Sequence, residues 1–292
     1  MANKRKGTKV KISAAVVSVI ILVSAVIYIY DLWKDPKKEN VVGECEFHFI
    51  DVGQGDSTLV LTEDSAILID AGPGKSADST LEYVRKHTDS IDYFILTHPH
   101  EDHIGGADEI LDTILVKNVI LSDATTDTVA FTNLLDSIEG SNANVIEAKA
   151  GEEYTLGEIE FTILSPLSSF TNLNDYSVVT RIEYGETAVI VTGDVENHSE
   201  GLICEKYLPA ELRADIYRVS HHGSSTSNSK EFMRLVDPEY AVISCGEGNS
   251  YGHPHVETID KLNKMDIEYY RTDKDGHTVF VSDGENVGLK QE

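Results

Sequence analysis

The residues best suited to chemistry lie in one short stretch, Thr97–Gly106, which reads THPHEDHIGG. Its imidazoles and its central carboxylate, His98, His100, Asp102 and His103, follow the order H-x-H-x-D-H. Imidazole and carboxylate together suit a borderline divalent ion such as Zn²⁺ or Mn²⁺. Asp102 and His103 are adjacent, so they point differently from the other two histidines, which is the arrangement that two neighbouring ions need. The pattern therefore predicts a dinuclear metal site.

The segment before this motif is expected to hold it in place. Residues Ile91–Leu96 form an apolar, β-rich run, which predicts a strand. A strand that stops there would deliver the imidazoles and the carboxylate to one edge of a sheet, on a loop too short to separate them. A chance histidine-rich loop is the alternative, and the full six-residue pattern between a strand and Gly-Gly argues against it.

Two later strands are also expected to end in residues that could hold a metal ion. Asp194 follows the β-rich run Thr187–Thr192, and its carboxylate could bridge two ions; a plain Gly-Asp turn is the alternative. His221 and His222 follow the next predicted strand. Because neighbours on an extended chain face opposite ways, only one of these histidines is expected to be a ligand.

The motif and its flanking stretches resemble the metallo-β-lactamase superfamily of dinuclear metal hydrolases. The flanking stretches are FIDVGQGDS at Phe49–Ser57, LIDAG at Leu68–Gly72, VTGDVE at Val191–Glu196, VSHHGSSTS at Val219–Ser227 and SYGHPH at Ser250–His255. Together they are similar to the hydrolase domain of the ComEC family of DNA-uptake competence proteins. The resemblance implies an α/β fold, the α/β/β/α sandwich of the superfamily, with two divalent metal ions, Zn²⁺ or Mn²⁺, as cofactors.

The resemblance also implies roles for individual residues. Asp194 would bridge the two ions, His222 would be a ligand, and His221 would face the substrate or support the ligands. The implied metal ligands are His98, His100, Asp102, His103, Asp194 and His222, and catalytic roles are expected for Asp102, His221 and His253.

One departure from the superfamily pattern concerns the first ion. Many members carry a third histidine for it, whereas residues Asn172–Ser177 read NLNDYS here. The first ion would then be held by His98, His100 and Asp194 with a weak ligand or water, a looser site that accepts Mn²⁺ more readily. Asn174 could contribute its side-chain oxygen, with a turn-forming asparagine as the alternative.

Further polar residues lie near the two ends of the resemblance. Pro254 fixes the backbone between His253 and His255, so one histidine can face the site while the other caps the helix that starts near His255. We expect His253 to hold a phosphoryl oxygen or to protonate a leaving group, with a surface histidine in a helix-entry turn as the alternative. Asp51 and Asp56 are expected to orient metal-bound histidines, or else to form a tight Gly-rich turn.

The chain from Cys45 onward alternates strand-like and helical segments. Predicted strands are Cys45–Ile50, Ser57–Leu61, Ala66–Asp70, Ile91–Leu96, Val116–Leu121, Tyr154–Leu156, Ile159–Ser165, Ser177–Tyr184, Thr187–Thr192, Ala214–Val219 and Tyr240–Ser244; predicted helices are Ser76–His87, Ala107–Ile114, Thr128–Ile138, Ser229–Leu235 and His255–Met265. Asp127 is expected to cap the third helix, and Asp70 is expected to be structural. Periodicity alone indicates a mixed α and β domain; the sandwich comes from the resemblance.

The beginning of the chain differs in kind from the rest. Five basic residues within positions 1–11 precede an uncharged apolar run, Ile12–Tyr30, close to the ~20 residues that a helix needs to cross a bilayer. We expect a cytoplasmic tail (1–11), a transmembrane anchor (12–30), a linker (31–43) and an extracellular hydrolase domain (44–292) at the cell membrane. A cleaved signal peptide is the alternative. Protease added to intact cells would test this orientation.

The predicted hydrolase domain is strongly acidic. Residues 40–292 hold 16 Lys and Arg against 47 Asp and Glu, a formal charge of −31. Such a surface repels polyanions, and no basic patch with interleaved aromatic residues is present to bind a nucleic-acid backbone. Cys45, Cys204 and Cys245 are widely spaced, and we expect small buried thiols in place of a disulfide framework.

These expectations combine into one function. Two metal ions that share a hydroxide can cleave phosphodiesters, lactams, lactones or thioesters, so the fold alone does not choose the substrate. The resemblance favours a membrane-anchored extracellular phosphodiesterase or nuclease that uses this hydroxide on DNA, with single-stranded DNA as one candidate, or on a smaller phosphodiester. The alternatives are a cell-wall phosphodiesterase of the teichoic acid phosphorylcholine esterase type and a catalytically weak metal-binding surface module. No stable protein partner is predicted.

Overall fold

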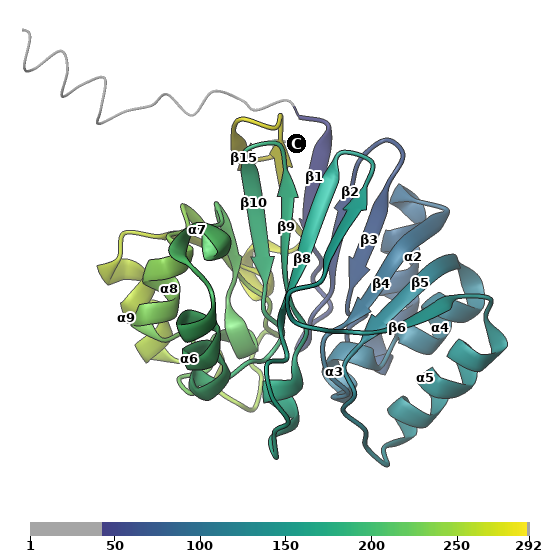
Figure 1. Cartoon of the computed structure of the whole chain (residues 1–292). Helices are drawn as coiled ribbons and strands as arrows, with labels where there is room; N and C mark the ends of the chain where they lie inside the picture. Colours follow the sequence, from purple (N-terminus) through teal and green to yellow (C-terminus); the bar gives the residue numbers. More distant parts are fainter. Residues whose placement is uncertain (1–42, 291–292) are drawn as a thin grey trace, which may run out of the picture. The chain divides into compact units, whose positions relative to one another are not determined.

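Two β-sheets form the centre of the fold in the computed structural model, which describes residues 43–290 (Figure 1). The strands are β1 Cys45–Phe49, β2 Thr58–Leu61, β3 Ala66–Ile69, β4 Ser90–Leu96, β5 Leu115–Leu121, β6 Asn144–Glu147, β7 Glu153–Leu156, β8 Ile159–Ser165, β9 Val179–Tyr184, β10 Thr187–Val191, β11 Ile216–Arg218, β12 Tyr240–Ile243, β13 Glu268–Arg271, β14 Thr278–Ser282 and β15 Val287–Leu289. The first sheet has the order β15-β14-β1-β2-β3-β4-β5-β6, and the second has the order β13-β12-β11-β10-β9-β8-β7.

The two sheets pack face to face through one apolar core. Side chains alternate between the two faces of a strand, so every second residue points toward the opposite sheet. Phe47 and Phe49 reach this core from β1, and Phe161, Ile182 and Val189 reach it from β8, β9 and β10, all of them fully buried. Burial of these large side chains is the main force that holds the sheets together.

Helices cover the outer face of each sheet. They are α2 Ala77–His87, α3 Glu101–Ile104, α4 Ala107–Thr113, α5 Val129–Gly140, α6 Asn197–Lys206, α7 Pro209–Leu212, α8 Lys230–Val236, α9 Val256–Lys264 and α10 Thr272–Asp275, with 3₁₀ turns at Gly74–Ser76, Leu173–Tyr176 and Ser220–Gly223. Apolar residues of α2, α4 and α5 pack on the first sheet, and those of α6, α8 and α9 pack on the second (Figure 1). The expected two-sheet sandwich with outer helices is confirmed.

Some local expectations differ from the structure. Helix α5 is capped by Thr128, whose hydroxyl accepts a hydrogen bond from the Phe131 N–H at 3.3 Å, so the expectation for Asp127 is wrong. Threonine is itself a good N-cap, and its position one residue closer to the helix decides the competition. The edge strand β6 and the short helix α3 had not been predicted. All three cysteines are free, with Cys204 only partly buried.

The loops that carry the predicted ligands follow neighbouring parallel strands. Strands β3 to β6 run parallel in the first sheet, and β10 to β13 run parallel in the second. The carboxyl ends of parallel strands lie at one edge of their sheet, which is where ligand sites form in such folds. The segments after β3, β4, β10, β11 and β12 therefore supply the site described below.

The predicted N-terminal tail and anchor, and all of the linker except Gly43, lie outside the described residues. Within residues 43–290, no helix is both long enough and apolar enough to cross a membrane.

A buried histidine on the outer face of β1 makes this region sensitive to acid. The Nδ1 atom of His48 lies 2.9 Å from the Tyr83 hydroxyl of α2, and its Nε2 atom lies 3.0 Å from a Glu46 carboxylate oxygen. The ring of His87 packs against it at 4.6 Å between centroids. Burial, followed by the charges of His87 and Lys290, outweighs Glu46 and lowers the pKa of His48 to about 4.

We expect this histidine to lower the stability of the domain in acid. The unfolded chain binds a proton at His48 near pH 6.5, before the folded chain does, so stability falls between pH 6.5 and about 4. At about 1.4 kcal/mol per pKa unit, the loss is about 3 kcal/mol. Urea unfolding at pH 7.5 and pH 4 should show a smaller acid loss for His48→Gln than for the wild type. A replacement of the exposed His198 by Gln is the control, and equal losses in all three proteins would contradict the assignment.

Candidate metal centre

The predicted metal-binding motif begins where β4 ends. His98 and His100 lie on the loop, with the Nε2 atom of His98 and the Nδ1 atom of His100 2.9 Å apart. Asp102 and His103 lie on α3, and the ring centroid of His103 is 4.2 Å from that of His98. Successive helix residues point about 100° apart. The short helix therefore separates the directions of Asp102 and His103 while it keeps His103 beside the loop histidines.

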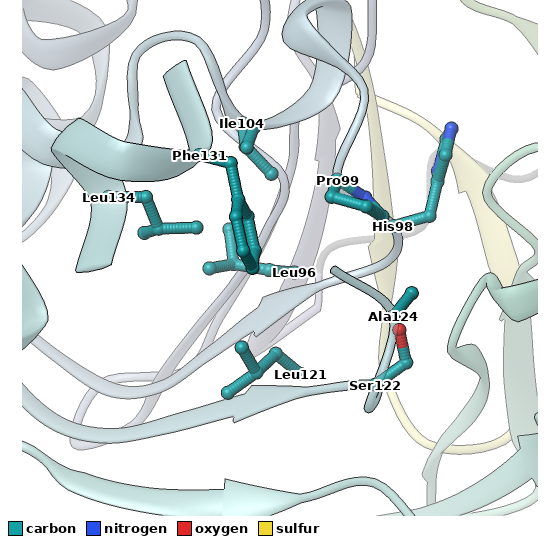
Figure 2. Close-up of a pocket in the computed structure, with 9 residues that line it drawn as sticks. All are labelled: Leu96, His98, Pro99, Ile104, Leu121, Ser122, Ala124, Phe131 and Leu134. Atoms are coloured by element: carbon teal, nitrogen blue, oxygen red, sulfur yellow. The ribbon is translucent and has the colours of Figure 1, made fainter. Parts of the chain in front are cut away.

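Apolar side chains pack behind this loop. A small pocket there is lined by Leu96, His98, Pro99, Ile104, Leu121, Ser122, Ala124, Phe131 and Leu134. Figure 2 shows the ring of His98 pointing away from Leu96, Phe131 and Leu134. The apolar side chains that line this pocket therefore support the loop from the side opposite the ring of His98.

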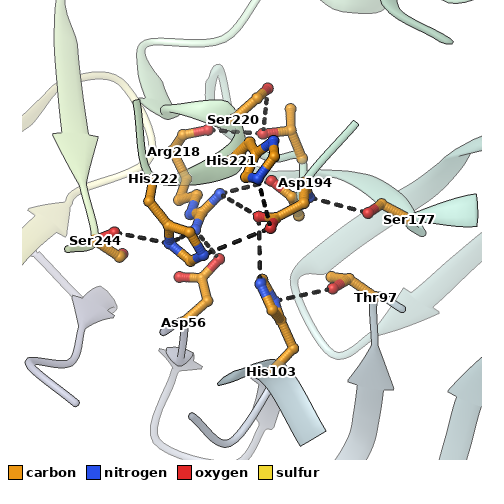
Figure 3. A network of polar contacts seen from close by, with 12 residues as sticks. Asp56, Thr97, His103, Ser177, Asp194, Arg218, Ser220, His221, His222 and Ser244 are labelled. Atoms are coloured by element: carbon orange, nitrogen blue, oxygen red, sulfur yellow. Dashed lines mark hydrogen bonds and ion pairs between the residues drawn. The ribbon is translucent and has the colours of Figure 1, made fainter. Parts of the chain in front are cut away.

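Asp194 lies at the centre of the predicted ligands (Figure 3). It follows β10 and is only 2% exposed. One carboxylate oxygen is 3.3 Å from Nε2 of His103, and the other is 3.5 Å from Nε2 of His222, 3.7 Å from Nε2 of His221 and 3.9 Å from Nε2 of His98. A carboxylate that faces imidazoles from both sheets is placed as a bridging ligand would be.

The two adjacent histidines after β11 have different surroundings. His222 is 1% exposed, and its Nε2 atom is 3.2 Å from a carboxylate oxygen of Asp102. Its Nδ1 atom is 2.9 Å from the Ser244 carbonyl, which can only accept, so Nδ1 carries the hydrogen and Nε2 presents a lone pair. The side chain of His221 is 20% exposed and lies toward Glu196.

The backbone geometry corrects the argument used to separate these two histidines. Residues Ser220–Gly223 form a tight turn in which His221 and His222 both have left-handed backbone angles, with φ of 51° and 53°. The chain here is not extended, so strand alternation does not apply. Such conformations are unfavourable for residues with a side chain and concentrate at functional sites. The choice of His222 as the ligand agrees with its burial and stays a prediction.

Asp70 orients His103. Its carboxylate lies 2.6 Å from Nδ1 of His103 and accepts hydrogen bonds from the N–H and the hydroxyl of Thr97 at 2.8 and 2.7 Å. The bond at Nδ1 turns Nε2 of His103 toward Asp194. A carboxylate in this position fixes the ring of a metal-binding histidine. Asp70 had been expected to be only structural, and this contact was not anticipated.

The electrostatics of the cluster favour a bound cation. Burial and then the neighbouring His103 hold the pKa of His98 well below its usual range. Burial alone would lower the pKa of His103, but Asp194 and Asp70 raise it well above its usual range. Burial alone would raise the pKa of Asp194, but His222 and His103 hold it well below its usual range. The same negative potential that holds a proton on His103 attracts a metal ion.

The residues present fit a divalent metal. Three buried atoms of ligand type have no hydrogen-bond partner among the described residues, namely Nε2 of His103, Nε2 of His222 and one carboxylate oxygen of Asp194. Ligand atoms of His98, His103 and Asp194 lie within 4.8 Å of one another, and so do those of Asp102, His103 and His222. Two overlapping sets of imidazole and carboxylate match the donors that Zn²⁺ and Mn²⁺ take.

Asn174, the candidate weak ligand, lies buried on the 3₁₀ turn Leu173–Tyr176. Its amide nitrogen donates to the Glu196 carboxylate at 3.1 Å, while its side-chain oxygen is buried without a hydrogen-bond partner among residues 43–290. Asn172 makes the local turn, because its side chain accepts from the Asn174 N–H at 3.2 Å. The side-chain oxygen of Asn174 is therefore available as a weak ligand.

The two histidines around Pro254 have separate surroundings. The ring centroid of His253 lies 5.4 Å from that of His221, so His253 faces the site. Burial, followed by His222 and His221, lowers its pKa to about 4. A neutral His253 suits hydrogen bonding to a substrate oxygen better than it suits proton donation at neutral pH. His255 precedes α9, and its ring accepts from the Ser225 N–H at 2.9 Å without capping the helix.

Neither aspartate of the DVGQGD stretch makes a direct hydrogen bond to a histidine through its carboxylate. The Asp51 carboxylate accepts a hydrogen bond from the Gly53 N–H at 3.0 Å. This contact agrees with the alternative prediction, a tight Gly-rich turn. The Asp56 carboxylate lies 2.6 Å from the guanidinium of Arg218, a buried residue for which no role had been predicted. Among the described residues, neither carboxylate is hydrogen-bonded to a predicted metal-binding histidine, although a carboxylate oxygen of Asp56 lies within 4.8 Å of a ring nitrogen of His103.

Comparisons with known proteins agree with this geometry. Residues 50–247 match the model of the metallo-beta-lactamase superfamily. ComE operon protein 3 of Bacillus subtilis is 30% identical over 253 residues, covering 80% of this chain and 32% of that protein, so the chain spans about a third of the relative's length. Exodeoxyribonuclease WalJ of Streptococcus pneumoniae is 24% identical over 235 residues, covering 73% of this chain and 86% of WalJ.

The fold is also found among solved structures. The metallo hydrolase Igni18 of Ignicoccus hospitalis matches with a TM-score of 0.54 and 17% sequence identity, covering 81% of this chain and 99% of that one. At this identity the likeness concerns the fold alone.

Proposed function

The chain belongs to the metallo-beta-lactamase superfamily, and from this premise we propose that it is a dinuclear metal-dependent phosphodiesterase. The observation that carries the proposal is the position of Asp194 among imidazoles from both sheets, with His103 and His222 each offering a buried, unpaired Nε2 atom. His98, His100 and Asp194 would hold one ion, and Asp102, His103, His222 and Asp194 would hold the other.

The predicted ligands and the residues around them would have different roles in the reaction. When bound, two divalent ions would polarise a phosphoryl group and lower the pKa of a water molecule. Asp194 would be a ligand to both ions, and Asp70 keeps His103 turned toward Asp194. His221 and His253 lie with ring centroids 5.4 Å apart, placed to hold the oxygens of a substrate.

The choice of a phosphodiester is supported by one similar protein, and the charge of the domain narrows the expected size of the substrate. WalJ, which is named as an exodeoxyribonuclease, is similar over 73% of this chain. The formal charge of −31 over residues 40–292 works against a long DNA-binding track, so a short single strand or a small diester fits this domain better than duplex DNA.

A substrate panel tests this proposal. The chain loaded with Mn²⁺ or Zn²⁺ would be assayed with bis-p-nitrophenyl phosphate, a short single-stranded DNA and nitrocefin, a β-lactam. We expect turnover of the first two and none of nitrocefin, because one fold can serve different substrates and the similar protein WalJ is named as an exodeoxyribonuclease. Asp215→Asn, at the opposite end of β11, is the control and should keep wild-type rates. Cleavage of nitrocefin alone would overturn the proposal.

A further inference from the structure

A fully buried arginine lies beside the predicted metal centre (Figure 3). Arg218 is the last residue of β11 and is 0% exposed. Among residues 43–290 it is the one Lys or Arg that is buried. A guanidinium is unfavourable in a protein interior unless its donors find partners. The partners of Arg218 therefore indicate what it does.

On the side of the second sheet, Arg218 contacts the segments that carry two predicted ligands. Its Nη1 atom donates to the Gly193 carbonyl at 2.6 Å and lies 3.8 Å from a carboxylate oxygen of Asp194. Its Nη2 atom packs 3.2 Å from Nδ1 of His222, the ring nitrogen that already donates to the Ser244 carbonyl. The guanidinium therefore holds the peptide before Asp194 by a hydrogen bond. It lies against one edge of the His222 ring without a hydrogen bond to it, because both facing nitrogens are donors.

On the side of the first sheet, Arg218 is held by Asp56, whose carboxylate oxygen is 2.6 Å from Nη2. The backbone of Asp56 is tied to the metal-binding motif, because its N–H donates to the Asp102 carbonyl at 3.0 Å. The preceding Gly55 allows this approach, since a Cβ atom there would lie 2.4 Å from the same carbonyl oxygen. Asp56 therefore moves with the segment that carries Asp102.

We propose that Arg218 and Asp56 form a positioning pair that holds the two halves of the metal centre in register. The inference rests on the proposed function. Asp102 comes from the first sheet, and Asp194 and His222 come from the second, so their separation depends on how the two loops meet. The Arg218–Asp56 ion pair joins the segment before β2, which is bonded to Asp102, to the end of β11, which lies beside Asp194 and His222. A guanidinium can pair with the Gly193 carbonyl and the Asp56 carboxylate in fixed directions, whereas the ammonium of lysine offers a single nitrogen.

The test compares Arg218→Lys with Arg181→Lys in the full chain. Arg181 lies on β9 and pairs with Glu183 away from the site, so its replacement controls for the loss of a guanidinium. Titration calorimetry with Mn²⁺ and with Zn²⁺ gives metal affinity, and thermal unfolding of the metal-free protein gives stability. We expect Arg218→Lys to bind both ions about 10–100-fold more weakly, the range for groups that orient metal ligands. Its kcat for bis-p-nitrophenyl phosphate should fall with little change in KM.

Asp56→Asn tests the same pair from the other side and keeps an acceptor for Arg218, so it guards against a variant that does not fold. It should weaken metal binding as Arg218→Lys does, and the double variant should lose less than the two single losses combined. Wild-type metal affinity and kcat in both variants, with only the metal-free unfolding temperature lowered, would overturn the positioning role. Failure of the wild type to bind any divalent ion would instead overturn the proposed function, and the inference with it.

Discussion

Asp194→Asn is expected to weaken divalent-ion binding by more than about 100-fold, beyond the loss seen when a group that only orients a ligand is changed. The side chain faces His103 with one carboxylate oxygen and His98, His221 and His222 with the other. Asparagine has nearly the same shape but lacks the charge and one of the two oxygens. Both ions would lose a ligand at once, so hydrolysis should fall to background.

Metal content after gel filtration, measured by mass spectrometry, checks this expectation. Asp215→Asn serves as the matched control, since Asp215 accepts from the Ala188 N–H at the other end of the sheet. Two ions and near-normal turnover in Asp194→Asn would show that this carboxylate does not bridge the metals.

The second large effect is expected from a comparison of His222→Ala with His221→Ala. His222 is 1% exposed, and its Nε2 atom lies beside the carboxylates of Asp102 and Asp194 without a hydrogen-bond partner among the described residues, free to bind a metal ion. Its loss should remove one of the two ions and nearly all activity. The partly exposed His221 lies at the edge of the cluster, and its loss should change metal affinity by less than about 10-fold, below the range for groups that orient ligands.

The two variants control for each other because they remove the same side chain from adjacent positions. Metal stoichiometry and kcat/KM would be measured for both. The reverse order of effects, with two ions retained in His222→Ala and one lost in His221→Ala, would assign the ligand to His221.

Local sequence patterns predicted those parts of the site whose residues are close together in the sequence. The strand that ends at Leu96 and the H-x-H-x-D-H order both lie within one segment, so strand and motif could be read together. The predicted strands Ser177–Tyr184 and Thr187–Thr192 were equally local. They pair as β9 and β10, with Gly185 in the turn between them at a φ of 62°. The sandwich could not be read from periodicity, because packing one sheet on another depends on contacts between distant residues.

The Arg218–Asp56 pair and the turn at His221 and His222 depend on contacts between residues far apart in sequence, so local patterns did not predict them. In the sequence, Arg218 is one charged residue in a short strand. It is paired and buried in the folded protein because the loop that carries Asp56 lies against it. The backbone of His221 and His222 is set in part by Asn228, whose amide donates to the Ser220 and Ser224 carbonyls at 3.0 and 3.1 Å. An argument from strand alternation could not anticipate that turn.

Metal dependence is the most direct test of the central claim that this chain is a dinuclear phosphodiesterase. The purified chain would be stripped with a chelator and assayed on bis-p-nitrophenyl phosphate while Mn²⁺ or Zn²⁺ is added in known amounts. We predict no turnover in the stripped protein and a rise that levels off at two ions per chain. Full turnover in the stripped protein, or a plateau at one ion, would contradict the claim.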